Sequence, residues 1–284
     1  MRCAWDALMS ILPVSFRAEV DKQGRDGLRE LRLRLDKPPE LVFAGRRQWL
    51  SGRVEKDDLE YCINVAGKYS PWAAAGIGEG YLTAKGGHRI GICGETAESE
   101  RGRVNFRSVS SLCIRVARDI PGISAGMERL QGNILILGRP GSGKTTLLRD
   151  YIRRESENRG VHMVVVDERC EIFPSNNGVP MMDTGKATDV LSGCGKAWGV
   201  ECALRAMSPD RIAVDEITAA GDCDALLKAG RCGVPIVATA HATSIEDLRL
   251  RPVYKPLYES RLFDYAVILQ PDSAWKGAYI RYDA

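Results

Sequence analysis

Polar and apolar positions follow two different patterns along the chain. In residues 28–35 and 111–118, apolar side chains alternate with charged or polar ones, as they do in a strand with one buried face. Residues 80–92 hold two short strand signals around the turn sequence Ala84-Lys85-Gly86-Gly87, which predicts a β-hairpin. Residues 59–66 are compatible with a helix. The first part of the chain is therefore expected to form a small α+β domain.

After residue 130 the apolar positions form continuous runs, which are typical of strands buried on both faces. These runs lie at residues 134–137, 161–166, 211–214 and 234–238. Between the first two runs, apolar positions 147, 148, 151 and 152 share one face of a predicted helix, which ends at Gly160. This order predicts an α/β fold with a mainly parallel sheet and helices on both faces.

A linker signal separates the two patterns. Pro121-Gly122 follows the second alternating segment, so we expect an N-terminal α+β domain over residues 1–120 and an α/β domain over residues 121–284. At 284 residues and 44% hydrophobic, the chain is long enough to bury the cores of two domains.

Composition narrows the class of protein. No run approaches the length of about 20 apolar residues that a membrane span needs, and the start of the chain lacks the layout of a secretory signal. We therefore expect a cytoplasmic protein without a membrane span. The nine cysteines include no C-x-x-C pair, which argues against a zinc site. The net charge of +3 is too small to indicate nucleic-acid or membrane binding by bulk electrostatics.

One octet carries a specific chemical prediction. It reads G-x-x-x-x-G-K-[ST] and consists of Gly138, Arg139, Pro140, Gly141, Ser142, Gly143, Lys144 and Thr145, with Thr146 next. Glycines let backbone N–H groups turn toward a phosphate, and the helix that begins at the lysine adds its positive dipole end. Lys144 would reach the β and γ phosphates, and the Thr145 hydroxyl would bind Mg²⁺. The alternative is an ordinary glycine-rich turn. The strand before the octet and the helix after it favour a nucleoside triphosphate such as ATP.

Two acidic segments follow apolar strands. Asp215 and Glu216 end the run 211–214, where Asp215 can hold Mg²⁺ and Glu216 can orient or deprotonate water. Glu168 and Glu171 follow the run that ends at residue 166, and they are further candidates for positioning the attacking water. The alternatives are an exposed acidic pair and a solvated loop.

Three more residues are candidates for the same chemistry. The run that begins at Val234 brings Thr239 and His241 to the same edge of the sheet, where His241 could sense the γ-phosphate. The alternative is a structural histidine at a strand end. Arg115 and Arg118 end the first domain, and one of them could reach a γ-phosphate across a subunit boundary as an arginine finger. A solvated or structural role is the alternative for both arginines.

Together these motifs resemble those of a known group of motors. Residues 204–216 resemble the Walker B region of the secretion and type IV pilus motor ATPases, residues 167–171 their Asp box and residues 239–243 their His box. Four segments are also similar to signature segments of the stage III sporulation protein AA family, which belongs to this superfamily: residues 80–83, 86–91, 110–118 and 166–172. The resemblance implies a RecA-like P-loop NTPase core behind the α+β domain.

The same resemblance implies a biological setting. It implies an Mg²⁺-dependent ATPase that forms a hexameric homo-oligomeric ring and energises a channel or secretion apparatus during endospore formation. The ring would contact a membrane channel or secretion-complex protein at the forespore membrane, on the mother-cell side. Two other functions stay open. A nucleic-acid-dependent RecA-like ATPase is disfavoured by the low net charge, and a nucleotide-binding switch without turnover is disfavoured by the carboxylates at strand ends.

Overall fold

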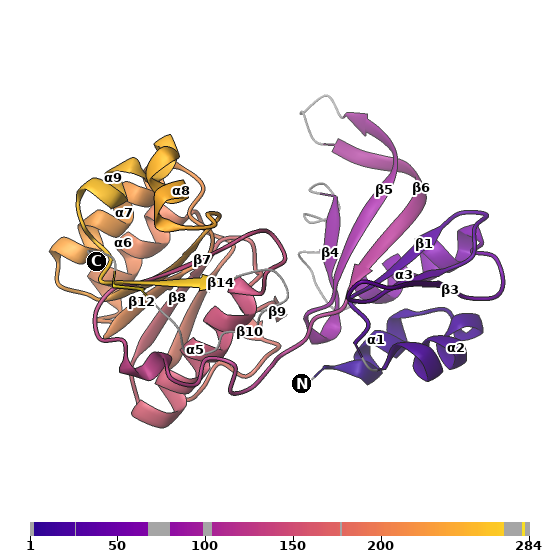
Figure 1. Ribbon diagram of the computed structural model, residues 1–284. Coiled ribbons are helices and arrows are strands. Elements are labelled where there is room, and N and C mark those ends of the chain that lie inside the picture. The colour runs from indigo at the N-terminus through magenta and orange to yellow at the C-terminus, as the bar shows by residue number, and fades with distance from the viewer. Residues whose placement is uncertain are drawn as a thin grey trace. The chain divides into compact units, whose positions relative to one another are not determined.

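The computed structural model describes residues 3–25, 27–67, 80–98, 104–176, 178–269 and 280–281. The chain divides into two compact units (Figure 1). The first unit comprises Met1–Arg118 and Pro174–Met182, and the second comprises Asp119–Phe173 and Asp183–Ala284. The segment 174–182 therefore belongs to the first unit, although the sequence pattern assigns it to the second domain. It holds the two short strands β9 (Ser175–Asn176) and β10 (Val179–Pro180).

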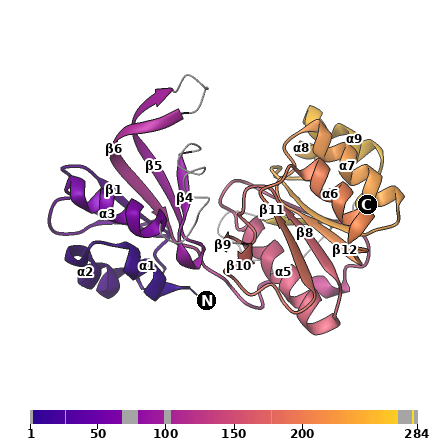
Figure 2. The same ribbon diagram turned by 180° about the vertical axis from the view of Figure 1, so that it is seen from behind.

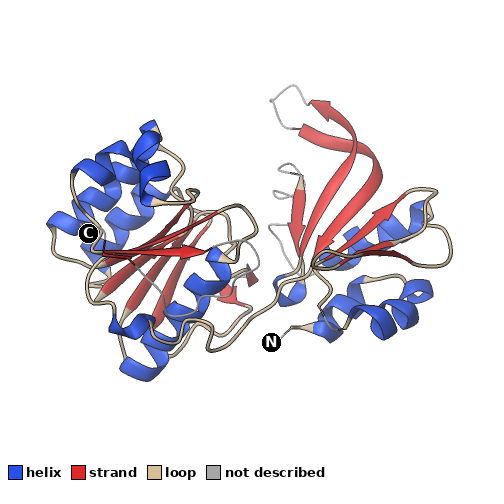
Figure 3. Cartoon of the chain, in the orientation of Figure 1, coloured by secondary structure: helices blue, strands red, loops and turns tan. Residues whose placement is uncertain are grey.

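The first unit contains a six-stranded antiparallel sheet with helices on one face. The strand order is β3-β2-β1-β6-β5-β4. The strands are β1 (Glu30–Arg34), β2 (Glu40–Val42), β3 (Arg47–Trp49), β4 (Tyr81–Thr83), β5 (Arg89–Glu98) and β6 (Val104–Arg115). The helices are α1 (Trp5–Ile11), α2 (Val14–Gly24) and α3 (Lys56–Gly67), drawn in blue in Figure 3. The predicted hairpin is present, with the short 3-10 turn η1 (Lys85–Gly87) between β4 and β5.

Alternation determines which face of this sheet is buried. Leu31 and Leu33 of β1 are fully buried and pack with helix residues such as Leu8 and Leu59, so the α+β prediction is confirmed. Strand β6 begins before the alternating segment 111–118, because its first half pairs with β5 as an extended hairpin whose described side chains are mostly exposed (Figures 1 and 2). Such a segment has no buried face to impose alternation.

The second unit is a seven-stranded sheet between two layers of helices. The strand order is β11-β8-β12-β13-β7-β14-β15, in which only the edge strand β15 runs antiparallel. The strands are β7 (Ile134–Gly138), β8 (Met163–Asp167), β11 (Thr188–Ser192), β12 (Arg211–Val214), β13 (Ile236–Ala240), β14 (Tyr265–Leu269) and β15 (Ile280–Arg281). The helices are α5 (Lys144–Arg159), α6 (Lys196–Ala206), α7 (Ala220–Arg231), α8 (Ile245–Leu250) and α9 (Lys255–Glu259), with 3-10 turns η2 (Met127–Arg129) and η3 (Pro252–Tyr254).

Figure 1 shows α5 on one face of this sheet and α6 to α9 on the other. The strands β7, β8, β12 and β13 are buried at every position, as their continuous apolar runs predict. Helix α5 ends where the sequence predicts, because Gly160 adopts the left-handed conformation that closes a helix. Among the described residues, no helix has the length and hydropathy that crossing a membrane requires.

A buried carboxylate and a buried guanidinium hold the segment that follows β8. The Asp167 carboxylate accepts hydrogen bonds from the backbone N–H groups of Glu171 and Phe173, both at 2.8 Å. Arg149 of α5 donates to the carbonyl oxygens of Ile172, at 2.5 Å, and Glu171, at 2.9 Å. Burial raises the pKa of Asp167 from 3.8 to about 6, although these hydrogen bonds oppose the shift. The backbone of residues 171–173 is therefore held both by Asp167 at the end of β8 and by Arg149 of α5.

A glycine in α6 sets the spacing between this helix and β8. A Cβ atom at Gly199 would lie 2.4 Å from Val166 Cγ1. We expect Gly199→Ala to lower the free energy of unfolding by about 1 to 3 kcal/mol, because overpacking forces a buried strand and helix apart. Urea denaturation followed by circular dichroism measures this change. Gly221→Ala in α7 is the matched control, since nothing lies within 4 Å of its added Cβ; an equal loss there would contradict the packing argument.

The raised pKa of Asp167 makes stability depend on pH. Its ionised form is disfavoured in the folded protein, so its contribution to stability is complete below pH 3.8 and is lost as pH rises through about 6. Relative to Asp167→Asn, the parent protein should lose up to about 3 kcal/mol of unfolding free energy between pH 4 and pH 7. Denaturant titrations at each pH measure the difference. The exposed Asp224→Asn is the control, and parallel curves for parent and Asp167→Asn would refute the assignment.

Candidate active site

The octet forms a tight loop between β7 and α5. Gly141 (φ +76°) and Gly143 (φ +97°) adopt the left-handed conformation, which side chains rarely tolerate. Gly138 is required for a different reason, because an added Cβ would lie 2.4 Å from Ser142 Oγ. The first backbone N–H groups of α5 have no partner within the helix. The loop therefore leaves them available to an anion bound at the N-terminus of α5.

Exposure within the loop divides its residues into two groups. Arg139, Pro140 and Gly141 are exposed, whereas Ser142, Thr145 and Thr146 are partly buried. Ser142 Oγ itself is buried and has no hydrogen-bond partner in the part of the chain that the structure describes. A buried hydroxyl group without a partner is rare in proteins, and a phosphate oxygen in the loop would supply the missing acceptor.

Lys144 is buried beneath this loop. Its Nζ donates to the carbonyl oxygens of Gly138, at 2.9 Å, and Arg139, at 3.1 Å, and to His241 Nδ1, also at 2.9 Å. Burial lowers the pKa of Lys144, while the carboxylates of Glu216 and Asp215 oppose the shift. The ammonium group therefore lies between the loop backbone and the acidic strand ends.

Asp215 connects the octet, the acidic pair after β12 and the segment at the end of β13. Its Oδ2 accepts a hydrogen bond from Thr145 Oγ1 at 3.1 Å, which joins the head of α5 to the end of β12. Its Oδ1 accepts from Thr239 Oγ1 of β13 at 2.7 Å and from the backbone N–H of Glu216 at 2.9 Å. Thr239 Oγ1 accepts in turn from the Glu216 N–H, at 2.9 Å. Asp215 is thus held in place by hydroxyl and amide groups.

Glu216 is strained and lies beside His241. Its φ of +23° is unusual for a residue with a side chain, and such strain is often found at functional sites. Glu216 Oε1 lies 2.8 Å from His241 Nε2, and Glu216 Oε2 lies 3.8 Å from Arg169 Nη1. Because the Lys144 ammonium can only donate, His241 Nδ1 accepts and the ring proton is on Nε2, facing Glu216.

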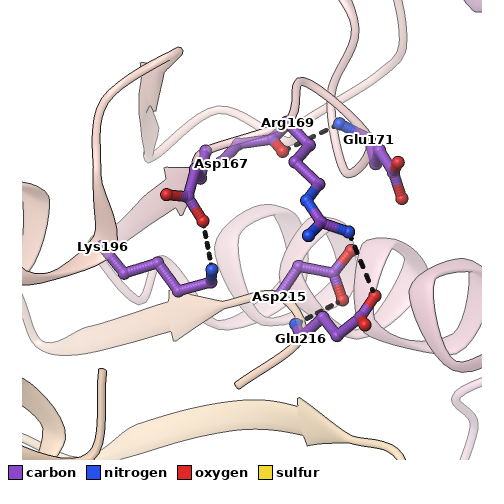
Figure 4. Close-up of a pocket in the computed structure, with 7 residues that line it drawn as sticks. Asp167, Arg169, Glu171, Lys196, Asp215 and Glu216 are labelled. Atoms are coloured by element: carbon purple, nitrogen blue, oxygen red, sulfur yellow. Dashed lines mark hydrogen bonds and ion pairs between the residues drawn. The ribbon is translucent and has the colours of Figure 1, made fainter. Parts of the chain in front are cut away.

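Seven residues line the pocket beside these strand ends. They are Asp167, Glu168, Arg169, Glu171, Lys196, Asp215 and Glu216. Five carboxyl groups thus share this space with two cations. In Figure 4, Arg169 reaches toward Glu216. Lys196 Nζ forms an ion pair with Glu168 Oε2. Two of the glutamates predicted to act on water, Glu168 and Glu216, are therefore each paired with a cation or a histidine.

The oxygen atoms at the loop fit a magnesium ion. The Thr145 hydroxyl and the Asp215 carboxylate are hydrogen-bonded neighbours, and both are the hard oxygen ligands that Mg²⁺ prefers. Among the described residues, no group of three histidine, cysteine or acidic side chains is arranged to hold a metal alone. An ion held here would therefore take its other ligands from phosphate oxygens and water, as Mg²⁺ commonly does.

The two predicted arginines differ in their surroundings within the first unit. Arg118 donates to the backbone carbonyl oxygens of Leu28, at 3.1 Å, and Arg25, at 3.2 Å, which is a structural arrangement. Arg115 is exposed and lies opposite Arg89 on β5 and Glu30 on β1 in the sheet register. A finger role stays a prediction for Arg115, and the structural alternative fits Arg118 better.

Lys144, Thr145, Asp215, Glu216 and His241 come together as the sequence predicts, while their catalytic roles stay predictions. Sequence reasoning missed three cations that organise the site, namely Arg149, Arg169 and Lys196. The position of Arg149 could have indicated a role at the site, because Arg149 lies one helical turn after Thr145 on α5, next to the apolar positions 147, 148, 151 and 152. Lys196 and Arg169 carry no spacing signal.

Two solved structures share this fold over most of the chain. The X-ray structure of the Legionella pneumophila ATPase DotB covers 90% of this chain and 75% of that chain, with 18% identity and a TM-score of 0.56. The crystal structure of the pilus retraction motor PilT with bound ADP covers 88% of this chain and 75% of that chain, with 17% identity and a TM-score of 0.59. The predicted RecA-like core behind an α+β region is therefore confirmed at the level of the fold.

Sequence comparison defines the family. Stage III sporulation protein AA of Bacillus subtilis (strain 168) is 36% identical over 270 residues, which span 90% of this chain and 88% of the relative. The family model described as "Sporulation stage III, protein AA" matches residues 6–281. This chain therefore belongs to the sporulation stage III protein AA family.

Proposed function

We propose that this chain is a Mg²⁺-dependent ATPase that converts ATP and water to ADP and phosphate. The observation that carries the proposal is the meeting of Lys144 and Thr145, at the head of α5, with Asp215, Glu216 and His241, at the ends of β12 and β13. This set combines a phosphate cradle, a buried cation, a metal-compatible oxygen pair and a carboxylate that can orient water. The fold shared with the ATPase DotB supports it.

ATP binding uses the loop and the residues beneath it. The octet Gly138–Thr145, with Thr146 beside it, would surround the phosphates with backbone N–H groups, and Ser142 Oγ would gain a partner. Lys144 would exchange a carbonyl or His241 partner for a phosphate oxygen. Thr145 and Asp215 would hold Mg²⁺, which neutralises charge on the phosphate oxygens when it is bound.

Hydrolysis requires a water molecule in line with the bond that breaks. Water attacks the γ-phosphorus, the bond to the β-γ bridging oxygen breaks, and ADP leaves with that electron pair. We assign the orientation of this water to Glu216 and Glu168, with Glu216 as acceptor of its proton, because Glu216 is bonded to Asp215 and Glu168 is held on the pocket wall by Lys196. Glu171 lines the same pocket and is a third candidate. His241 would report phosphate occupancy, since its two nitrogens face Lys144 and Glu216.

An arginine from a neighbouring subunit would complete the charge stabilisation. We assign this role to Arg115 rather than Arg118, because Arg118 is engaged by backbone carbonyl groups whereas Arg115 is exposed. A guanidinium group at the γ-phosphate stabilises the charge that develops in the transition state.

Family membership supports a motor role. A member of the sporulation stage III protein AA family that shares its fold with a pilus retraction motor is suited to work as a secretion-type motor during endospore formation. We propose a cytoplasmic hexameric ring, which a membrane channel or secretion-complex protein holds at the forespore membrane on the mother-cell side. This assignment rests on family analogy, not on the chemistry of the site.

Removing the loop lysine tests the ATPase proposal. We expect Lys144→Ala to lower the phosphate release rate at least about 100-fold, because the transition state loses a charged donor in a buried position. A phosphate release assay measures the rate, and circular dichroism checks the fold. Lys255→Ala, which removes an exposed lysine of α9, should leave the rate unchanged. Full activity of Lys144→Ala would sink the nucleotide-site assignment.

Mixing two inactive variants tests the arginine. We expect Arg115→Ala to lower the rate about 1,000-fold. Mixed rings of Arg115→Ala and Lys144→Ala subunits should regain activity, because some sites then combine an intact loop with an intact arginine from the neighbour. The rate per subunit of the parent protein should also fall on dilution below ring assembly. No recovery in the mixture, together with a rate that is independent of concentration, would rule out a finger acting between subunits.

A further inference from the structure

A buried lysine that no motif identifies lies at the start of α6. Only 5% of the Lys196 side chain is exposed. A buried ammonium group is costly unless carboxylates surround it, so its position is informative. Its Nζ contacts Glu168 Oε2 and lies 3.6 Å from Asp222 Oδ2. Lys196 thus places a fixed positive charge on the wall of the pocket that contains the proposed water-orienting carboxylates.

The two carboxylates that face Lys196 differ in their other partners. Asp222 caps the start of α7, where its Oδ2 accepts from the backbone N–H groups of Thr218, at 2.8 Å, and Ala219, at 3.0 Å. Glu168 has Lys196 as its single partner within the described residues. Asp222 is therefore anchored without Lys196, and the orientation of Glu168 depends on it.

The anchoring extends to the other acidic segment. Thr218 and Ala219 lie two and three residues after Glu216, so Asp222 connects the segment after β12 to α7. Lys196 contacts Asp222 and Glu168 together, and so it links the segment after β12 with the segment after β8. Lys196 therefore connects the segments that carry Glu168 and Glu216, the two carboxylates assigned to one water molecule in the proposed mechanism.

Burial is unequal across the ion pair. The Glu168 side chain is 38% exposed, while that of Lys196 is almost fully buried. An ion pair contributes little net stability once the loss of hydration is counted, so stability alone is a weak reason to bury this lysine. The buried Lys196 ammonium group binds one oxygen atom of the half-exposed Glu168 carboxylate. The other oxygen atom can then accept a hydrogen bond or a proton from a water molecule in the pocket.

We propose that Lys196 is a positioning residue, which holds the Glu168 carboxylate toward the attacking water of the ATPase reaction. The inference rests on the proposed function. Lys196 does not touch the nucleotide in this assignment; it acts through Glu168, with Asp222 keeping the ammonium group in place.

A double-mutant cycle tests the role. Lys196→Met should lower kcat about 100-fold, because a small displacement of a reacting group has an effect of that size. The KM for ATP and the affinity for Mg-ADP should change less than about threefold, since the loop is untouched. Glu168→Gln should have a similar effect, and the double variant should be no slower than the slower single variant, because the two residues act as a unit. Lys196→Arg, which retains the charge, should recover part of kcat.

Controls separate this role from a structural one. Lys228→Met removes a lysine that is 57% exposed and pairs with Glu201 on α6, and it should leave kcat unchanged. If Lys196→Met does not fold, Lys196→Gln replaces it in the same cycle. Unchanged kcat in the Lys196 variant, or effects of Lys196 and Glu168 that multiply, would overturn the assignment. If the parent protein binds ATP without releasing phosphate, the proposed function and this role both fail. If the parent protein and Lys196→Met release phosphate at the same rate, the proposed role of Lys196 fails while the proposed ATPase function stands.

Discussion

The parallel register of β8, β12, β13 and β7 is the constraint on which the rest of the site depends. Val166, Val214, Ala238 and Leu135 lie at one level of the sheet. One residue further along, Thr239 is level with the end of β12, which is why its hydroxyl reaches Asp215. Two residues beyond that, His241 comes level with Gly138 and reaches the lysine beneath the loop. A slip of one residue in any strand would turn these side chains to the other face. The apolar burial of the strands therefore fixes the chemistry at their ends.

Crowding of negative charge is the second constraint. Asp167, Glu168, Glu171, Asp215 and Glu216 share one pocket, and their mutual repulsion requires compensation. The compensation is local and differs for each group. Asp167 is buried among backbone N–H groups, Glu168 pairs with Lys196, and Glu216 lies between His241 and Arg169. These three carboxylates have separate partners, and so part of the repulsion within the pocket is offset by the protein itself.

The sequence predicts this molecule best where a strand ends in a motif. The apolar runs predict four of the parallel strands, β7, β8, β12 and β13, but not β11 or β14. The octet and Asp215-Glu216 directly follow two of these runs, and parallel strands bring their carboxyl ends to one edge. Prediction failed where contacts are distant in sequence. Lys196 pairs with Glu168 across 28 positions, and Arg149 reaches the carbonyl group of Ile172 across 23, with no periodicity to mark either. The segment 174–182 belongs to the first unit, whereas the predicted boundary near residue 120 places it in the second domain. So short a segment carries no linker signal in the sequence.

The contacts of Lys144 link binding to the state of the acidic site. An ammonium group has three N–H donors, and in this structure Gly138, Arg139 and His241 accept from all three. A phosphate group that enters the loop must displace at least one of them. The carbonyl groups belong to the loop backbone and move with it, whereas the imidazole ring belongs to the residue after β13 and is bonded on its other side to Glu216. Exchange at His241 would therefore alter the hydrogen bond to Glu216, the strained residue beside Asp215. Occupancy of the phosphate loop and the orientation of a water-facing carboxylate are in this way coupled through one side chain.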